Sequence, residues 1–371
     1  MDSKLSERKA EIVMKKVLSV FLALILTLSL AACGPEKVAG GEKVWKVAVL
    51  LPYIGDQSYY DAVEAGRKTL DAREEIEATL IEIGTDQAQW ESYFMDACES
   101  GYDLIVSGYA DVEPTLYSAA KMYPDQLFFN FDYSTHEDLD NVFAVTYSLS
   151  ELGYLAGTLS SLVTTSGMEK ANPENKVGVI VGEDSEYMND FIGSYCQVCA
   201  EMGTQVYISY PNSFEDPAKG KEQALAMYNE GVDIIWQVAG GTGLGVFEAA
   251  ADADKYTIGV DADQAKSFTG QPQLAQTIVT SMFKDCGAAL VYAVEELIGG
   301  SYPAGTTKTM GLAEGTLGVV ENDQYLEMVP EEIRKQVNDA AEKLKSGEIV
   351  PYSVVAEPER WEEIKAAAMK G

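Results

Sequence analysis

The sequence predicts an α/β fold made of two doubly wound, Rossmann-like lobes, in which helices cover both faces of a mainly parallel sheet. Short β-branched or aromatic runs alternate with longer helical patterns, as they do in β-α-β units. The alternation restarts after residue 148, which indicates two such sets. About 340 of the 371 residues follow the N-terminal segment, and that length suits two domains of roughly 100–200 residues each.

The elements of the first set follow one another closely. The run KVAVLLPY at 46–53 predicts a strand, and the helical pattern at 58–73 begins at Ser58, a plausible N-cap. The rest of the set is predicted as strands at 78–84, 102–109, 127–133 and 142–147, with helices at 86–100 and 112–123.

The second set opens with a helix at 149–165, in which Gly153 and Gly157 are four residues apart and favour close packing. Further strands are predicted at 176–182, 205–210, 232–239 and 256–261, connected by helices at 186–202, 216–230 and 243–253. Two doubly wound units therefore account for residues 45 to about 263.

The residues after about 263 either return to the first unit or add elements to both units. It predicts a strand at 276–281, a helix at 282–298, strand-like runs at 307–313 and 316–321, and a charged helix at 330–347. We expect lobe one to comprise 45–147 and about 265–310, and lobe two to comprise 148–264 and about 311–371. Lobes joined by several crossings can close on a ligand, which in parallel sheets sits beyond the carboxyl ends of the strands.

The N-terminal segment indicates export. Lys15 and Lys16 precede an apolar run at 17–30, which is a signal-peptide pattern shorter than the roughly 20 residues of a membrane span. The run ends in Leu-Ala-Ala-Cys, which resembles the lipobox of bacterial lipoproteins and implies cleavage before Cys33 and lipidation of its thiol. An ordinary signal peptide with a chance cysteine is the alternative.

The polar residues at 34–44 predict a flexible tether. We therefore expect the protein at the extracytoplasmic face of the cell membrane, with its lipid as the only membrane contact.

Composition excludes several function classes. A formal charge of −32 repels phosphate backbones, so we expect no nucleic-acid partner. Cys196 and Cys199 lie within a helical pattern, which favours buried thiols, with a disulfide as the alternative. His136 is the only histidine and rules out a multi-histidine metal site. We expect no metal, no cofactor and no enzymatic activity.

Five segments occur in an order and spacing that resemble one family. They are GDQSYY at 55–60, DPAKG at 216–220, GGTG at 240–243 with the helix after it, GVDADQ at 259–264, and TSMFK at 280–284. With the lipobox, they are similar to the motifs of the basic membrane protein (PnrA-like) family of ABC-transporter substrate-binding lipoproteins. The resemblance implies a type I periplasmic-binding-protein fold with a hinged interlobe cleft. It also implies a purine nucleoside or related ribosyl ligand, and ABC permease and ATPase subunits as partners.

Two departures from the family leave other ligands open. Tyr60 stands where the family has Asn, and Pro52 stands where it has a carboxylate at the end of strand one. Another small polar ligand, such as a sugar or a signalling furanose, is therefore the alternative. A nucleoside-processing enzyme would want an Asp cluster on a calcium ion, which does not follow strand one. A surface adhesin without transport is a further possibility.

The candidate ligand contacts lie at predicted strand ends and helix starts. Asp261 ends a buried apolar strand, where a carboxylate needs donors such as ribose hydroxyls. Lys284, expected at the start of the helix after a strand, can pair with a carboxylate or a base carbonyl. The set is Asp56, Tyr59, Tyr60, Asp132, Phe191, Trp236, Gly240, Gly241, Asp261 and Lys284.

Each of these residues also has a structural interpretation. Tyr59 and Tyr60 can stack on a flat base or pack in the core, and Asp56 can bind ligand or cap a helix. Asp132 and Phe191 match a carboxylate and an aromatic residue of the family, although Phe191 also suits a core. Trp236 lies in an apolar strand, where Trp is more often core. Gly240 and Gly241 let a backbone approach a ligand, and their run lacks the Lys-Ser/Thr of a phosphate-binding loop.

Overall fold

The computed structural model describes residues 43–134 and 139–371. Its strands form two six-stranded sheets, in the orders β11-β5-β4-β3-β1-β2 and β12-β10-β9-β8-β6-β7. In the described chain every strand pair is parallel except β10 with β12. The prediction of two mainly parallel α/β sheets is confirmed.

The first sheet has helices on both faces. Its strands are β1 (Trp45–Leu51), β2 (Ile76–Glu82), β3 (Leu104–Ser107), β4 (Leu127–Asn130), β5 (Val142–Tyr147) and β11 (Thr306–Met310). Its helices are α2 (Tyr59–Asp71), α3 (Gln87–Glu99), α4 (Glu113–Met122) and α11 (Cys286–Ile298). Val47 and Val49 belong to the same core cluster as α2 and α11, whereas Ala48 and Leu50 belong to that of α3 and α4. Successive side chains of a strand point to opposite faces of the sheet, so the same strand contributes to a hydrophobic core on each face.

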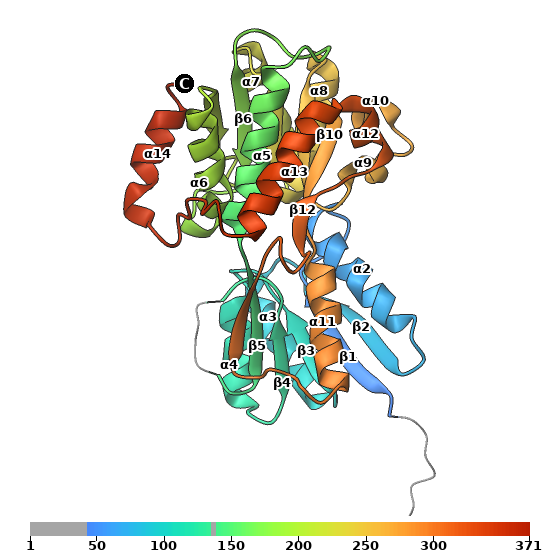
Figure 1. Cartoon of the computed structure of the whole chain (residues 1–371). Coiled ribbons are helices and arrows are strands. Elements are labelled where there is room, and N and C mark those ends of the chain that lie inside the picture. Colours follow the sequence, from blue (N-terminus) through green and yellow to red (C-terminus); the bar gives the residue numbers. More distant parts are fainter. Residues whose placement is uncertain (1–42, 135–138) are drawn as a thin grey trace, which may run out of the picture. The chain divides into compact units, whose positions relative to one another are not determined.

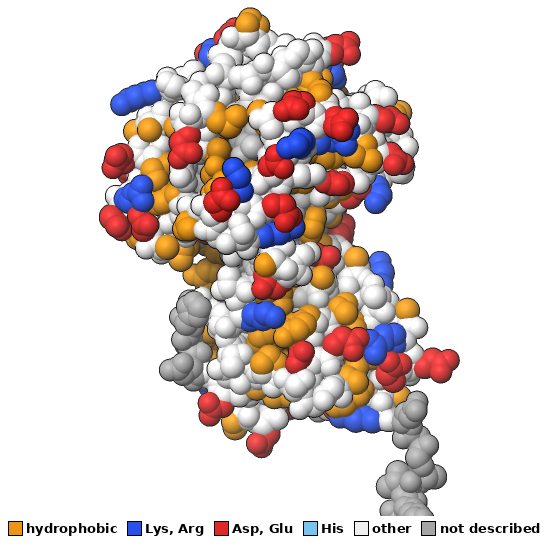
Figure 2. Space-filling model, viewed as in Figure 1, with side chains coloured by type: hydrophobic (Ala, Val, Ile, Leu, Met, Phe, Trp, Pro, Cys, Tyr) orange, Lys and Arg blue, Asp and Glu red, His pale blue; other side chains and the backbone are white. Residues whose placement is uncertain are grey.

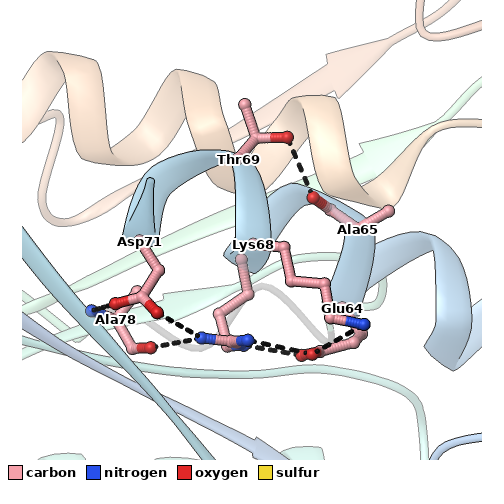
Figure 3. Close-up of polar contacts among 7 residues, drawn as sticks. Glu64, Ala65, Lys68, Thr69, Asp71 and Ala78 are labelled. Atoms are coloured by element: carbon pink, nitrogen blue, oxygen red, sulfur yellow. Dashed lines mark hydrogen bonds and ion pairs between the residues drawn. The ribbon is translucent and has the colours of Figure 1, made fainter. Parts of the chain in front are cut away.

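Helices α2 and α11 lie side by side (Figure 1). A Cβ at Gly66 would lie 2.5 Å from the Cα atom of Gly287, so only glycine permits this approach. On its other side α2 is tied to β2, because Arg67 donates to the Ala78 carbonyl at 2.5 Å and to the buried Glu64 carboxylate at 2.6 Å. Figure 3 shows the polar contacts of this helix, including Asp71.

The second sheet is built in the same way. Its strands are β6 (Lys176–Val181), β7 (Gln205–Ser209), β8 (Ile234–Val238), β9 (Tyr256–Asp261), β10 (Ile278–Lys284) and β12 (Leu317–Val319). Its helices include α5 (Leu149–Thr164), α6 (Glu186–Glu201), α7 (Pro217–Asn229), α8 (Leu244–Ala253), α13 (Glu331–Lys345) and α14 (Trp361–Ala368). A Cβ at Gly153 of α5 would lie 2.0 Å from the Phe191 carbonyl oxygen of α6, which confirms the close packing expected there.

The sheet membership of residues 265–284 corrects the expected boundary. These residues were expected in lobe one, but β10 pairs with β9 and β12 of the second sheet. The helix expected at 282–298 begins only at Cys286, because Asp285 caps it by accepting the N–H of Ala288. Lys284 is therefore the last residue of a strand, not the first of a helix. The chain passes between the sheets after β5, after β10 and after β11.

Several shorter helices had no counterpart in the sequence prediction, namely α9 (Gln264–Ser267), α10 (Pro272–Ala275), α12 (Asp323–Met328) and α14. Cys196 and Cys199 are buried free thiols, as expected. Cys33, the tether as far as residue 42 and His136 lie outside the described residues.

Within 43–134 and 139–371, no helix is long and apolar enough to cross a membrane. On the face that Figure 2 shows, the described Lys and Arg side chains are interspersed with Asp and Glu.

Candidate functional site

A cavity of about 300 Å³ lies at the carboxyl ends of the strands of both sheets. The first sheet contributes residues that follow β1, β2, β3 and β4, and the second contributes residues that follow β6, β7 and β8 together with the last residues of β9 and β10. This is the position at which open parallel sheets bind ligands. The candidates that line the cavity are Asp56, Tyr59, Tyr60, Asp132, Phe191, Gly240, Asp261 and Lys284.

Two candidates do not reach the cavity. Trp236 lies in the middle of β8 with no exposed surface, its ring stacked on Tyr195 at 5.7 Å and its Nε1 donating to the Gly259 carbonyl at 3.2 Å. It is a core residue, as an apolar strand favours. Gly241 does not line the cavity either, although its neighbour Gly240 does.

Asp132 joins side chains of both sheets. It follows β4 and is 1% exposed. Its Oδ2 accepts from the Tyr59 hydroxyl at 2.8 Å and from Lys284 Nζ at 3.0 Å. Its Oδ1 accepts from the hydroxyl of Tyr187, in α6, at 2.6 Å. Both carboxylate oxygens are therefore occupied by donors of the protein, two of which belong to the second sheet and its helices.

Lys284 is a buried cation enclosed by aromatic rings. Its Nζ lies 4.7 Å from the ring centroid of Tyr59, 5.3 Å from that of Phe191 and 5.4 Å from that of Tyr147. Burial disfavours its charge, but Asp132 and other nearby groups outweigh burial and raise the pKa of Lys284 above its ordinary value. The ring faces and the carboxylate both stabilise the ammonium. The cation is therefore already paired within the protein.

Asp261 ends β9 in a left-handed conformation, with a φ of 63°. Its Oδ2 accepts from the Ser58 hydroxyl at 2.6 Å, a contact between the two sheets' units. Burial raises the pKa of Asp261 to about 6, against the lowering effects of Lys284 and Ser58. Because Oδ1 accepts no hydrogen bond from the described residues, this carboxylate retains an acceptor that can face the cavity.

At the start of α2 the helix is capped by Asp56 and not by Ser58, which the sequence favoured as the cap. Ser58 occupies the N-cap position, but its side chain caps no backbone group and instead donates to Asp261. The cap is Asp56, whose carboxylate accepts the backbone N–H groups of Ser58, Tyr60 and Asp61 at 3.0–3.2 Å. Burial raises the pKa of Asp56. The capping interpretation of Asp56 thus describes its contacts, although the residue also lines the cavity.

Aromatic residues that the sequence analysis missed form much of the remaining wall. They are Tyr53, Trp90, Tyr109, Tyr187 and Phe214. Tyr53 contacts Tyr60 edge to face at 5.0 Å, and Tyr109 contacts Phe214 in the same way at 5.9 Å. Tyr53 and Tyr109 each follow a parallel strand by two residues, so the rule about carboxyl ends could have found them.

The charge of the wall is strongly negative. Lys284 is the single Lys or Arg among the residues that line the cavity, and six carboxyl groups accompany it: Asp56, Asp111, Asp132, Glu183, Glu215 and Asp261. Because Lys284 is committed to Asp132, the described residues of the site offer acceptors and ring faces but no unpaired cation. It suits a neutral ligand with donor groups and disfavours an anion.

Comparison with known proteins gives the family. Residues 45–353 match the family model described as ABC transporter substrate-binding protein PnrA-like. The chain is 28% identical over 361 residues to the ABC transporter nucleoside-binding protein BmpA of Lactococcus lactis, with 90% of this chain and 98% of the relative covered. It is also 28% identical over 352 residues to Basic membrane protein A of Borreliella burgdorferi, with 91% of this chain and 95% of that protein covered.

Solved structures agree with the family. An ABC transporter solute-binding protein from Aeropyrum pernix K1 has a TM-score of 0.72 and 25% identity, covering 88% of this chain and 99% of its own. A solute-binding protein from Conexibacter woesei, at 21% identity and a TM-score of 0.67 over 84% of this chain and 99% of its own, shows the shared fold. The strand orders, the cavity between the sheets and the match over residues 45–353 lead to one conclusion. The chain belongs to the PnrA-like family of ABC transporter substrate-binding proteins, which bind their ligands without catalysing a reaction.

Proposed function

We propose that this protein is a lipid-anchored receptor that captures a purine nucleoside, or a related ribosyl compound, for an ABC importer. The main support for the proposal is the composition of the cavity wall. The wall contains aromatic rings and carboxylates, and its cation, Lys284, is already paired with Asp132. A nucleoside is neutral, presents a flat base to rings and offers ribose hydroxyls to carboxylates. The nucleoside-binding protein of Lactococcus lactis, to which the chain is similar, supports the same class.

The acceptor for the ribose is Asp261 in this proposal. Asp261 is 8% exposed and lines the cavity, and one of its carboxylate oxygens accepts from Ser58. A hydroxyl donor from the ligand would satisfy the other oxygen, which a buried carboxylate requires. Tyr59 is less suited to stack on the base than the sequence suggests, because its ring faces Lys284 and its hydroxyl is bound to Asp132.

The two sheets belong to separate units of the chain, which suggests how the protein closes on its ligand. We propose that the unit around the first sheet (45–147 and 286–310) and the unit around the second (149–284 and 317–371) move as lobes about the three connections between them. Closure would bring Ser58 to Asp261 and Tyr187 to Asp132, the contacts present in this conformation. The N-terminal segment would be removed before Cys33, whose lipid would hold the protein at the extracytoplasmic face beside its permease.

Thermal unfolding with added ligands tests the ligand class. A ligand that binds the folded protein alone raises the melting temperature by mass action, by an amount that grows with its concentration relative to Kd. Adenosine, guanosine or inosine should raise it at concentrations where ribose, phosphate and amino acids do not, and nucleoside monophosphates should act more weakly. A sugar that stabilises the protein while no nucleoside does would instead establish the sugar-binding alternative, for which Pro52 and Tyr60 are the departures in the sequence.

A further inference from the structure

Tyr109 has a backbone conformation that L side chains rarely adopt. Its φ is 99°, whereas the other described non-glycine residues with positive φ are Asn, Asp or Gln. Such a conformation destabilises the folded state and persists only where the surrounding structure imposes it, commonly at ligand sites. Glycine would occupy this position without strain. The presence of a tyrosine here therefore calls for a role of its ring.

The turn that contains Tyr109 is fixed on both sides. It follows β3 by two residues, and the Tyr109 carbonyl accepts the N–H groups of Val112 and Glu113 at the start of α4, both at 3.1 Å. The ring is half-buried and lines the cavity. Its centroid lies 6.1 Å from that of Tyr59 and 5.9 Å from that of Phe214, which belongs to the second sheet's unit. The strained backbone thus directs the ring across the cavity.

Three other aromatic residues of the cavity are committed to Lys284. The rings of Tyr59, Tyr187 and Phe191 surround the Lys284 ammonium at 4.7, 6.0 and 5.3 Å. Tyr109 has no such cation partner among the described residues, and the rings next to its own are those of Tyr59 and Phe214. Its face or edge is therefore available to a planar ligand in the cavity.

We infer that Tyr109 is a specificity-determining residue, whose ring is held in a strained turn to form the wall against the planar base of the ligand. The inference rests on the proposed nucleoside function and refines it. The ring selects for a ligand that carries a base over a bare sugar, because a planar base stacks on an aromatic ring with a larger apolar face than a hydroxyl-rich sugar.

The first experiment measures the strain through the stability of the ligand-free protein. Tyr109→Ala and Tyr109→Gly both remove the ring, but alanine keeps a Cβ at positive φ. The glycine variant should therefore melt about 2 °C or more above the alanine variant. Tyr53, a half-buried tyrosine that also lines the cavity and whose φ is not positive, is the matched control. There the order should reverse, with glycine the less stable. Equal or reversed order at position 109 would overturn the claim of strain.

The second experiment measures adenosine affinity by calorimetry. Tyr109→Ala should weaken binding about tenfold or more, the effect of losing one base–aromatic contact. Tyr109→Phe, which keeps the ring, should stay within about threefold of wild type. Tyr93→Ala, at an exposed tyrosine of α3 that does not line the cavity, should match wild type.

The outcomes separate the inference from the proposed function. Adenosine binding by wild type that is unchanged in Tyr109→Ala overturns the role of the ring and leaves the nucleoside function intact. If wild type binds no nucleoside, both the proposed function and the base-contacting role are wrong, and the order of the alanine and glycine variants still decides whether the turn is strained.

Discussion

Lys284 Nζ lies 3.0 Å from Asp132 Oδ2, and the two side chains are 3% and 1% exposed. The lysine ends β10 of the second sheet and the aspartate follows β4 of the first, so a buried ion pair connects the two units at the cavity. Burial of both charges is favourable only because each has further partners: two tyrosine hydroxyls for the carboxylate and several ring faces for the ammonium.

Removal of one partner of this pair should destabilise the protein strongly. Lys284→Met leaves the Asp132 carboxylate buried without its cation, which typically costs about 3–5 kcal/mol of unfolding free energy. Chemical denaturation measures the change, and Lys284→Met with Asp132→Asn should recover part of the loss. Lys335→Met, which breaks the exposed pair with Asp339, is the control and should have little effect. A small effect of Lys284→Met would show that the pair is not needed for the buried site.

Ligand affinity should fall in acid because of Asp261. Its pKa is raised to about 6, and donors on a ligand require the ionised carboxylate. Affinity should therefore be constant well above pH 6 and decrease by about tenfold per pH unit below it. Titrations of adenosine between pH 5 and pH 8 measure this dependence. Asp261→Asn should bind more weakly at pH 8 and should lose the decrease near pH 6; a variant that keeps it would assign the titration to another group.

The raised pKa of Asp261 also affects the stability of the ligand-free protein, which should change with pH in the direction opposite to ligand affinity. A carboxyl group whose pKa is higher in the folded than in the unfolded state favours folding when protonated. The contribution of Asp261 to stability should therefore increase as the pH falls from above 6 toward the unfolded pKa of about 4. The difference in unfolding free energy between wild type and Asp261→Asn should shrink over this range. A difference that grows in acid would contradict the raised pKa.

The hydroxyl of Tyr187 should slow ligand release. It donates across the two units to Asp132, and Tyr187→Phe removes this bond while the ring remains. Loss of a hydrogen bond to a charged group, about 1.5–3 kcal/mol, should increase the dissociation rate by roughly ten- to a hundredfold. Stopped-flow displacement of a bound nucleoside measures the rate. Tyr210→Phe, which loses a hydroxyl bond to Asn189 away from the cavity, is the control and should release ligand at the wild-type rate.

Membrane attachment should depend on Cys33. If the cysteine carries lipid, Cys33→Ala should release the protein from the membrane fraction, and radiolabelled palmitate should mark wild type alone. Cys98→Ala, at a thiol of the folded body, should remain attached and labelled. Wild-type protein that takes up no label would exclude the lipid anchor.

The fold was predictable because it depends on apolar runs. The segments VAVLL and VDIIWQV are buried from both faces of their sheets, and such continuous runs are characteristic of parallel strands. The boundary near Lys284 was not predictable in the same way. The residues 282–284 continue an apolar strand and also fit a helix, and only pairing with β12 and the cap at Asp285 decide between them.

The site was predictable in part. The position of Asp261 and Asp132 at strand ends follows from the alternation of strands and helices, whereas Lys284 was expected at the start of a helix; all three line the cavity. Their pairing did not follow, because it depends on how the two sheets meet. Tyr109 follows β3 by two residues, so the rule about carboxyl ends could have placed it at the cavity; its strained backbone, however, is encoded by no local pattern.

Calorimetric titration of adenosine, guanosine and inosine into wild type and Asp261→Ala tests the central claim most directly. We predict that at least one nucleoside binds wild type with one-to-one stoichiometry. Asp261→Ala, with an unchanged circular dichroism spectrum, should bind the same nucleoside about ten- to a hundredfold more weakly. Nucleoside binding of equal strength in both proteins would place the ligand outside this cavity. Binding of ribose or another sugar to wild type, with no heat from any nucleoside, would contradict the account.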